Sequence, residues 1–265
     1  MGGLVETWHH QIIAELVHDG TGCLLILNKN FKLLYLNEGA AVLHLIDLGN
    51  VYSADELVKL QDHYLSKGVQ LIHLWEDIWR TRREQVLARV RSILGLNLKI
   101  HARKTEVVSI TKVEADQFLN ENHLQLSVGA RFKYGLRMDQ KLVAVACFSN
   151  FRRMQDQGDD YRSVELIRFA NLKGVTVTGG FTKLIAHFIK LHQPNDIMSY
   201  ADRDWSAGAA YQKSGFKLVA ITPPAEILLN KITCERIFPH RLSGANHEDH
   251  HRIFNTGNLK YILYL

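Results

Sequence analysis

The chain has 265 residues, of which 46% are hydrophobic and 22% are charged, as in an ordinary globular protein. It contains no apolar run approaching the roughly 18 residues of a membrane-spanning helix, and its first residues lack the basic and apolar regions of a secretion signal. The cysteines, Cys23, Cys147 and Cys234, are scattered, which fits a reducing compartment and gives no metal-binding spacing. We therefore expect a cytoplasmic protein without a membrane partner. The net charge of +5 and the pI of about 9.0 permit a polyanionic partner without requiring one.

The first hundred residues alternate between helical and extended patterns. The predicted order is helix, strand, strand, helix, strand, helix, at residues 7–17, 23–27, 31–36, 54–67, 69–74 and 80–94. The surface of the last helix is basic, and we expect it to contact nucleic-acid phosphates through Arg80, Arg82, Arg83, Arg89 and Arg91. A solvated basic surface is the alternative explanation for these arginines. The sequence leaves the oligomeric state open.

This order and three local segments resemble one group of phage and bacterial homing-endonuclease-like proteins. These proteins join a domain related to the very-short-patch-repair endonuclease to a GNAT (N-acetyltransferase)-like domain. The segments that carry the resemblance are Leu71–Trp79, Ile100–Lys104 and Tyr200–Ser206. The resemblance implies an α/β (α+β) fold with a small restriction-endonuclease-like domain over residues 1–104 and a GNAT-like mixed sheet over residues 105–265.

The nuclease half departs from the resemblance at the catalytic position. Such nucleases hold Mg²⁺ with an acidic residue at the end of a core strand, usually as Asp-Gly followed by Trp-His. The corresponding segment here is Tyr35–His44, in which Glu38 stands in place of the aspartate, His44 in place of the histidine, and the tryptophan is missing. We therefore predict a degenerate nuclease domain without a metal site. Glu76 and Asp77 are explained by capping of the helix that follows them.

The second half of the chain matches the GNAT order β-α-β-β-β-α-β-α-β. Its central part runs from Arg162 to Lys217, where Thr178-Gly179-Gly180 precedes an amphipathic helix. A glycine turn at a helix N-terminus exposes amide groups and suits an anion such as a pyrophosphate, although an ordinary strand–helix turn has the same composition. The GNAT resemblance places the loop Q/R-x-x-G-x-G/A here and implies acetyl-CoA as cofactor, bound by Val177, Thr178, Gly179, Gly180, Phe181, Thr182 and Lys183. Val177 replaces the usual Gln or Arg of that loop.

A second GNAT motif, N-x-x-A-x-x-L-Y-x-x-x-G-F, is matched by Asp204, Ala207, Ala210, Tyr211, Gly215 and Phe216. The resemblance implies that Tyr211 protonates a leaving thiolate and that Glu165, on the preceding strand, acts as the base for an amine. A packed aromatic residue and an outward-facing strand carboxylate are the alternatives. We expect a GNAT-type N-acyltransferase that uses acetyl-CoA on an amine that the sequence does not identify. A nucleic-acid-binding protein related to homing endonucleases is the second hypothesis.

Overall fold

The computed structural model of the protein describes residues 7–154, 157–158, 160–239 and 249–265. Contacts between residues divide the chain into two compact units, each made of three segments. Unit 1 contains the chain up to Arg83, Asp202–Ala207 and Thr222–Asn258, and unit 2 contains Glu84–Ala201, Gly208–Ile221 and Leu259–Leu265. The mixture of helices and sheets confirms the predicted α/β fold class. No helix in these residues is long and apolar enough to cross a membrane.

The division into units differs from the predicted domain boundary at residue 104. Residues 84–104 lie with unit 2, whereas Asp202–Ala207 and Thr222–Asn258, assigned to the second domain from the sequence, lie with unit 1. The sequence-based prediction assigned one continuous segment to each domain. It therefore could not detect units that are built from several segments of the chain.

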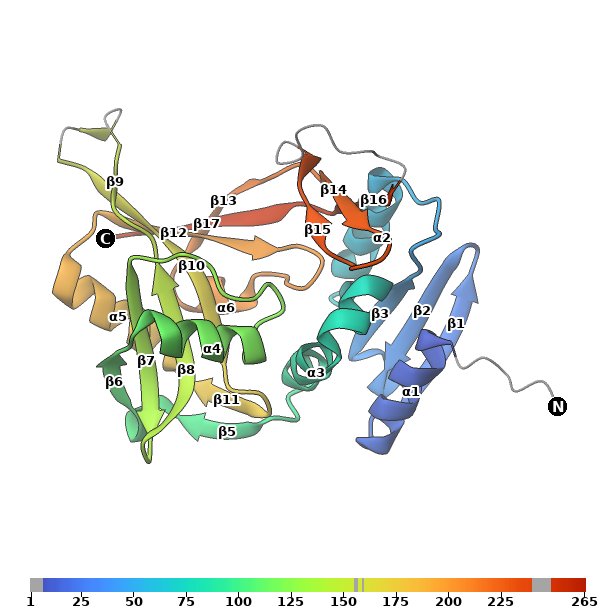
Figure 1. Cartoon of the computed structure of the whole chain (residues 1–265), viewed down its shortest axis with the longest axis horizontal. Coiled ribbons are helices and arrows are strands. Elements are labelled where there is room, and N and C mark those ends of the chain that lie inside the picture. Colours follow the sequence, from blue (N-terminus) through green and yellow to red (C-terminus); the bar gives the residue numbers. More distant parts are fainter. Residues whose placement is uncertain (1–6, 155–156, 159, 240–248) are drawn as a thin grey trace. The chain divides into compact units, whose positions relative to one another are not determined.

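Unit 1 is built on a four-stranded sheet in the order β1-β2-β3-β4 (Figure 1). The first three strands are antiparallel and the last two are parallel, and they cover Cys23–Asn28, Phe31–Leu36, Ala41–Ile46 and Gln70–Trp75. Its helices are α1 (Trp8–His18), α2 (Ala54–Ser66) and the beginning of α3 (Glu76–Ile93), which departs from helical geometry at Arg82. A smaller antiparallel sheet contains β14 (Ala225–Asn230), β15 (Arg236–Ile237) and β16 (His250–Asn255).

The segment Tyr35–His44, which was compared with a nuclease active site, runs from the end of β2 through a short turn into the first half of β3. Glu38 is exposed in the short 3-10 turn Asn37–Gly39, where its φ is 58°. His44, in contrast, is completely buried within β3. All six residues of β3 are buried, as expected of a strand whose sheet is covered on both faces. Glu38 and His44, which stand in place of the family's aspartate and histidine, thus lie in different environments, one exposed and one buried.

His44 pairs instead with His73 of the neighbouring strand. Their Nδ1 atoms lie 3.1 Å apart, and His73 Nε2 donates to the carbonyl of Leu57 at 3.1 Å. A neutral imidazole carries one N–H, so His73 Nδ1 must accept the proton of His44 Nδ1. His44 Nε2 is then a bare acceptor, and it is buried without a partner in the described part of the chain. The pair is therefore built for two neutral rings.

Unit 2 is built on a mixed sheet with the order β13-β17-β12-β10-β8-β7-β6 and the short β9 beside β10 (Figure 1). In chain order, its strands are β6 (Glu106–Ser109), β7 (Phe132–Met138), β8 (Lys141–Phe148), β9 (Arg152–Arg153), β10 (Arg162–Asn171), β12 (Asp196–Asp202), β13 (Lys217–Ile221) and β17 (Asn258–Tyr264). Its helices are α4 (Lys112–Asn122), α5 (Gly180–His192) and α6 (Ala209–Lys213). A separate parallel pair joins β5 (Leu98–His101) to β11 (Val175–Thr178). This order of elements agrees with the predicted β-α-β-β-β-α-β-α-β series.

The central sheet of unit 2 packs helices against both faces, because alternate residues of β8 point in opposite directions. Ala144, Ala146 and Phe148 lie in the core beneath α5, and the Phe148 ring stacks on Phe188 of that helix at a centroid distance of 4.0 Å. Val145 and Cys147 lie in the core beneath α4, which Figure 1 shows in front of β7 and β8. Packing against β8 thus holds α5, and with it the N-terminus of this helix, on the sheet.

The buried histidine pair predicts acid-sensitive stability. Burial lowers the pKa of both rings, with the neighbouring charge of His73 adding to the effect on His44; the pKa of His73 falls to about 3. Below the ordinary value of 6.5, the unfolded chain binds protons that the folded chain does not, so stability falls as the pH falls. The slope contributed by each histidine is at most about 1.4 kcal/mol per pH unit. Urea titrations between pH 7 and pH 4 should show a smaller loss for His44→Leu/His73→Leu than for the wild type. The exposed His18→Leu is the control, and an equal loss in all three proteins would contradict the prediction.

Candidate functional site

The predicted anion-binding loop is the N-terminus of α5. Gly179 precedes the helix with a φ of 77°, a left-handed conformation that favours glycine. Gly180 is buried, and a Cβ atom there would lie 2.9 Å from Val177 Cβ and 3.1 Å from Leu136 Cδ1, so the close approach also requires glycine. Thr178, Gly179 and Thr182 are exposed. The first amides of a helix have no acceptor within it, so this exposed end presents donors and a positive dipole to solvent.

The other predicted loop residues mostly point into the protein. Val177 is buried in the core beneath α5. Phe181 makes edge-to-face contacts with Phe169 at 5.1 Å and with Tyr211 at 5.4 Å between ring centroids. The Lys183 ammonium donates to the carbonyl of Ala102 at 2.9 Å and to that of Thr105. The lysine therefore ties α5 to the turn after β5, and its charge remains near the helix N-terminus.

Beside this helix, strands β10 and β12 separate. They pair in parallel only from Ser163 to Glu165, although both strands continue beyond the pairing. On its other side β10 is bulged between Leu166 and Arg168, where its register with β8 shifts. Within the described chain, β12 therefore does not pair with β10 beyond Glu165. The side of β10 that faces β12 beyond Glu165 is its parted edge.

Tyr211 places its hydroxyl at the point where the strands part. Ser199, on β12, donates its single hydroxyl proton to the carbonyl of Leu166 at 2.8 Å, and its Oγ lies 3.1 Å from the Tyr211 hydroxyl. The Tyr211 proton must therefore be donated to Ser199 Oγ. Burial raises the pKa of Tyr211, while the hydrogen bond to Ser199 and the positive charges of Arg89 and Arg168 oppose this rise. Tyr211 is thus protonated, and its hydroxyl proton points towards Ser199 Oγ.

The Tyr211 ring is fixed from the other side by Tyr261, whose ring stacks on it at 4.9 Å with an interplanar angle of 7°. This arrangement depends on Gly208, because a Cβ atom at that position would lie 1.8 Å from the Tyr261 hydroxyl. Gly208 also has a φ of 80° and precedes α6. The glycine three residues before Tyr211 is therefore explained by the close approach of Tyr261.

Glu165, the predicted base, is the last residue of β10 that pairs with β12. It alternates with Val164 and Leu166, which belong to the core beneath α5, so its side chain points to the opposite face of the sheet. Its carboxylate lies 3.4 Å from Arg152. Ser199 links Tyr211 to Leu166, the residue after Glu165, so Glu165 and Tyr211 lie at the same position along β10. They lie on opposite faces of the sheet.

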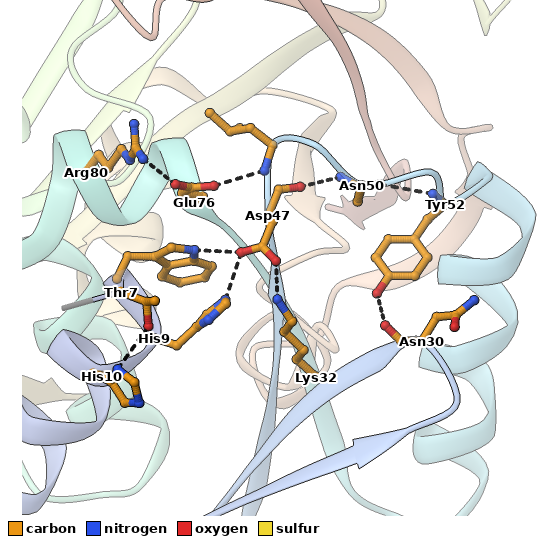
Figure 2. A network of polar contacts seen from close by, with 12 residues as sticks. Thr7, His9, His10, Asn30, Lys32, Asp47, Asn50, Tyr52, Glu76 and Arg80 are labelled. Atoms are coloured by element: carbon orange, nitrogen blue, oxygen red, sulfur yellow. Dashed lines mark hydrogen bonds and ion pairs between the residues drawn. The ribbon is translucent and has the colours of Figure 1, made fainter. Parts of the chain in front are cut away.

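A second polar cluster lies in unit 1 around Asp47, a residue that the sequence analysis did not single out (Figure 2). Asp47 directly follows β3, and Glu76 directly follows β4. The Asp47 carboxylate accepts a hydrogen bond from Trp8 Nε1 at 2.8 Å, lies 2.8 Å from His9 Nε2 and pairs with Lys32. Burial alone would raise the pKa of Asp47, but hydrogen bonds from Lys32 and Trp8 and the charges of His9 and Lys32 outweigh it and lower the pKa. The carboxyl ends of neighbouring parallel strands lie at the same edge of a sheet. The sequence could therefore have predicted that Asp47 and Glu76, which follow two such strands, lie close together.

The Asp47 cluster does not fit a divalent metal ion. The oxygens of Asp47 are engaged by Trp8, His9 and Lys32, and Glu76 accepts from the amide of Leu48 at 3.0 Å and pairs with Arg80 at 2.5 Å. Within the residues that the structure describes, no group of three or more His, Cys, Asp or Glu side chains is arranged to hold a metal. The carboxylates are therefore neutralised by the protein's own cations.

The basic residues predicted to bind nucleic acid are also partly engaged. Arg80 pairs with Glu76, and Arg83 pairs with Glu15 and lies over the Trp79 ring at 5.1 Å. Arg82 donates to the carbonyl of Thr81 at 3.0 Å. The arginines of unit 1 thus have intramolecular partners, and the charge available for phosphate is smaller than their number suggests.

No family model matches the sequence, and no curated protein matches it. Among solved structures, the chain is similar to a GNAT family acetyltransferase from Elizabethkingia anophelis with acetyl-CoA bound, at 14% identity and a TM-score of 0.38, covering 61% of this chain and 99% of that one. It is also similar to the ribosomal-protein-S18-alanine N-acetyltransferase from Escherichia coli, at 13% identity and a TM-score of 0.40, covering 60% of this chain and 93% of that one. An acetyltransferase from Bacillus cereus shows 13% identity and a TM-score of 0.38, over 61% and 99% of the two chains.

The contacts of Lys183 predict a structural role for this residue. In Lys183→Met the Thr105 carbonyl loses its ammonium donor, and we expect the free energy of unfolding to fall by about 1–3 kcal/mol. Urea denaturation measures this change. Lys190→Met removes an exposed ammonium from the last turn of the same helix and should alter stability by less than about 0.5 kcal/mol. Equal effects of the two substitutions would show that the tie to residues 102–105 contributes nothing.

Proposed function

We propose that unit 2 binds acetyl-CoA and transfers its acyl group to an amine. The observation that carries this proposal is the separation of β10 and β12 after Glu165, with the exposed N-terminus of α5 beside it and the Tyr211 hydroxyl at the point of separation. A thioester ligand with a phosphate end and an extended amide arm needs these features together: anion-binding amides, an unpaired strand edge and a proton donor.

The loop residues fit the phosphates of such a ligand. Amides in the first turn of α5, together with the exposed Thr178 and Thr182, would bind the pyrophosphate, and the dipole of this helix adds positive potential. Gly179 leaves the approach free of a side chain. Val177 is buried and would support the loop by packing only. The amide arm would then extend along the parted edge of β10 towards Ser199.

Two residues of unit 2 can move the protons. The Glu165 carboxylate can accept a proton from an ammonium substrate, which leaves a neutral amine able to attack the thioester carbon. As the carbon–sulfur bond breaks, Tyr211 can give its proton to the thiolate. The nitrogen loses its second proton to solvent as it becomes an amide, and Tyr211 takes a proton back from solvent. Because Ser199 donates its own proton to the Leu166 carbonyl, Ser199 Oγ accepts the hydrogen bond from Tyr211 when no ligand is bound. Ser199 is therefore a positioning residue for Tyr211.

Calorimetric titration with acetyl-CoA tests the proposal. Wild-type protein should show saturable binding, and Thr182→Glu should weaken it at least about tenfold, because a carboxylate in the first turn of α5 repels phosphate. Lys190→Gln changes the net charge by the same amount in the last turn of α5 and should leave the affinity within about twofold. Absence of heat with wild type at millimolar acetyl-CoA, or equal loss in both variants, would refute the assigned site.

We propose a second function for unit 1, nucleic-acid binding, as the sequence resemblance implied. The observation that favours it is the group of arginines Arg80, Arg82 and Arg83, which follows the acidic first turn of α3. Asp47 and Glu76 lie nearby at the ends of adjacent parallel strands. Metal-assisted cleavage needs carboxylates free to hold the ion, and here both are engaged by the protein. Binding without cleavage is therefore the expected behaviour.

Fluorescence anisotropy with a labelled DNA duplex tests the second function. Binding should weaken with salt, and Arg82→Gln should reduce the log–log salt slope by about one, whereas Lys59→Gln on α2 should not. Supercoiled plasmid should stay intact with Mg²⁺ or Mn²⁺. Cleavage that Asp47→Asn abolishes and Glu38→Gln preserves would instead identify a working nuclease site around Asp47.

A further inference from the structure

Strand β5 brings basic side chains to the N-terminus of α5. It pairs in parallel with β11 and places His101 level with Thr178, the residue before the glycine turn (Figure 1). Ile100 and Val177, which precede these two residues, are both buried in the core beneath α5. Because successive residues of a strand point to opposite faces, His101 and Thr178 point away from that core, and both are exposed.

The turn that follows β5 is fastened to the first turn of α5. The Lys183 ammonium donates to the carbonyl of Ala102 at 2.9 Å and to that of Thr105. A Cβ atom at Gly179 would lie 3.7 Å from the Cβ atom of Ala102. Residues 101–104, called here the basic turn, therefore lie beside the amides that are proposed to bind phosphate.

The side chains of the basic turn are not used within the protein. His101, Arg103 and Lys104 are exposed, and in the described part of the chain none of them makes an ion pair or a side-chain hydrogen bond. The nearest carboxylate along the chain, Glu106, faces Arg137 across the pairing of β6 with β7. The positive charge of the basic turn is therefore available to an anion from outside the chain.

We propose that the basic turn binds the 3′-phosphate on the adenosine ribose of CoA. This inference rests on the proposed binding of acetyl-CoA and adds a contact that distinguishes CoA from its dephosphorylated form. Only the ribose separates the 3′-phosphate from the pyrophosphate, so side chains beside the pyrophosphate site can reach both groups. A phosphate monoester carries roughly two negative charges at neutral pH. Arg103 can bind it through two parallel hydrogen bonds, and Lys104 adds a point charge.

The direction of the ligand places its nucleotide on the same side of the helix. Phe181 contacts Tyr211 of α6 at 5.4 Å between ring centroids, and the Thr182 hydroxyl lies 3.2 Å from that of Ser214, just after α6. The acyl arm is proposed to run towards Tyr211, so it leaves the N-terminus of α5 on the side of α6. Lys183, in contrast, contacts the basic turn. The other end of the pyrophosphate, which carries the adenosine, is therefore directed to the basic turn.

Calorimetric titrations with acetyl-CoA and with 3′-dephospho-acetyl-CoA test the proposal. Wild type should bind acetyl-CoA at least about tenfold more tightly, because only this ligand has the additional phosphate. Arg103→Gln and Lys104→Gln should each weaken acetyl-CoA binding about fivefold and leave the affinity for the dephospho ligand within about twofold. The double variant should bind the two ligands about equally. Lys190→Gln, in the last turn of α5, should keep the wild-type preference, because its charge lies more than a screening length of about 8 Å away.

The outcomes separate this inference from the proposal on which it rests. Circular dichroism melting should show that all variants are folded. Equal affinity of the wild type for the two ligands would overturn the 3′-phosphate contact and leave acetyl-CoA binding in place. An equal loss of both ligands in the double variant would also overturn it, because the basic turn would then act on the pyrophosphate or on the loop. If the wild type bound neither ligand, both proposals would fail.

Discussion

The proposed chemistry of unit 2 depends on one interruption in its main sheet. Parallel strands normally continue side by side, and β10 and β12 stop pairing after Glu165. Two observed features accompany this separation. The bulge between Leu166 and Arg168 changes the course of β10, and Ser199 uses its side chain to bond the carbonyl of Leu166 that backbone pairing would otherwise bond. A serine in this position allows the strands to part without leaving that buried carbonyl unpaired.

The elements of this site could largely be predicted from the sequence. Gly179 and Gly180 mark the turn, and the apolar spacing of Leu184, Ile185 and Phe188 marks α5, because both signals are local. The roles of Lys183 and Ser199 could not be predicted in this way. Lys183 bonds carbonyls about 80 positions earlier in the chain, and Ser199 bonds one 33 positions earlier, so only the folded arrangement identifies their partners.

Unit 1 shows how a motif comparison can hide a strand. Tyr35–His44 was interpreted as a catalytic turn because of its residue types. The apolar run Ala41–Ile46 was therefore not predicted to be a strand, although it is a buried one. The carboxylates at the sheet edge come from Asp47 and Glu76. Their neutralisation by Lys32 and Arg80 depends on a hairpin and a helix that are separate in sequence. Strand periodicity predicts where the carboxylates lie, and only the structure reveals their partners.

The interleaving of the two units has a consequence for how the protein can be made. The last strand of unit 2, β17, lies between β12 and β13 in the sheet. It is synthesised only after Thr222–Asn258, a segment that belongs to unit 1. During translation the main sheet therefore lacks a strand between β12 and β13 until β17 has left the ribosome. Tyr261, which stacks on Tyr211, comes from that strand. Truncation before β17 would thus remove Tyr261 from the proposed site. Neither unit can be isolated with a single cut, because each consists of three segments of the chain.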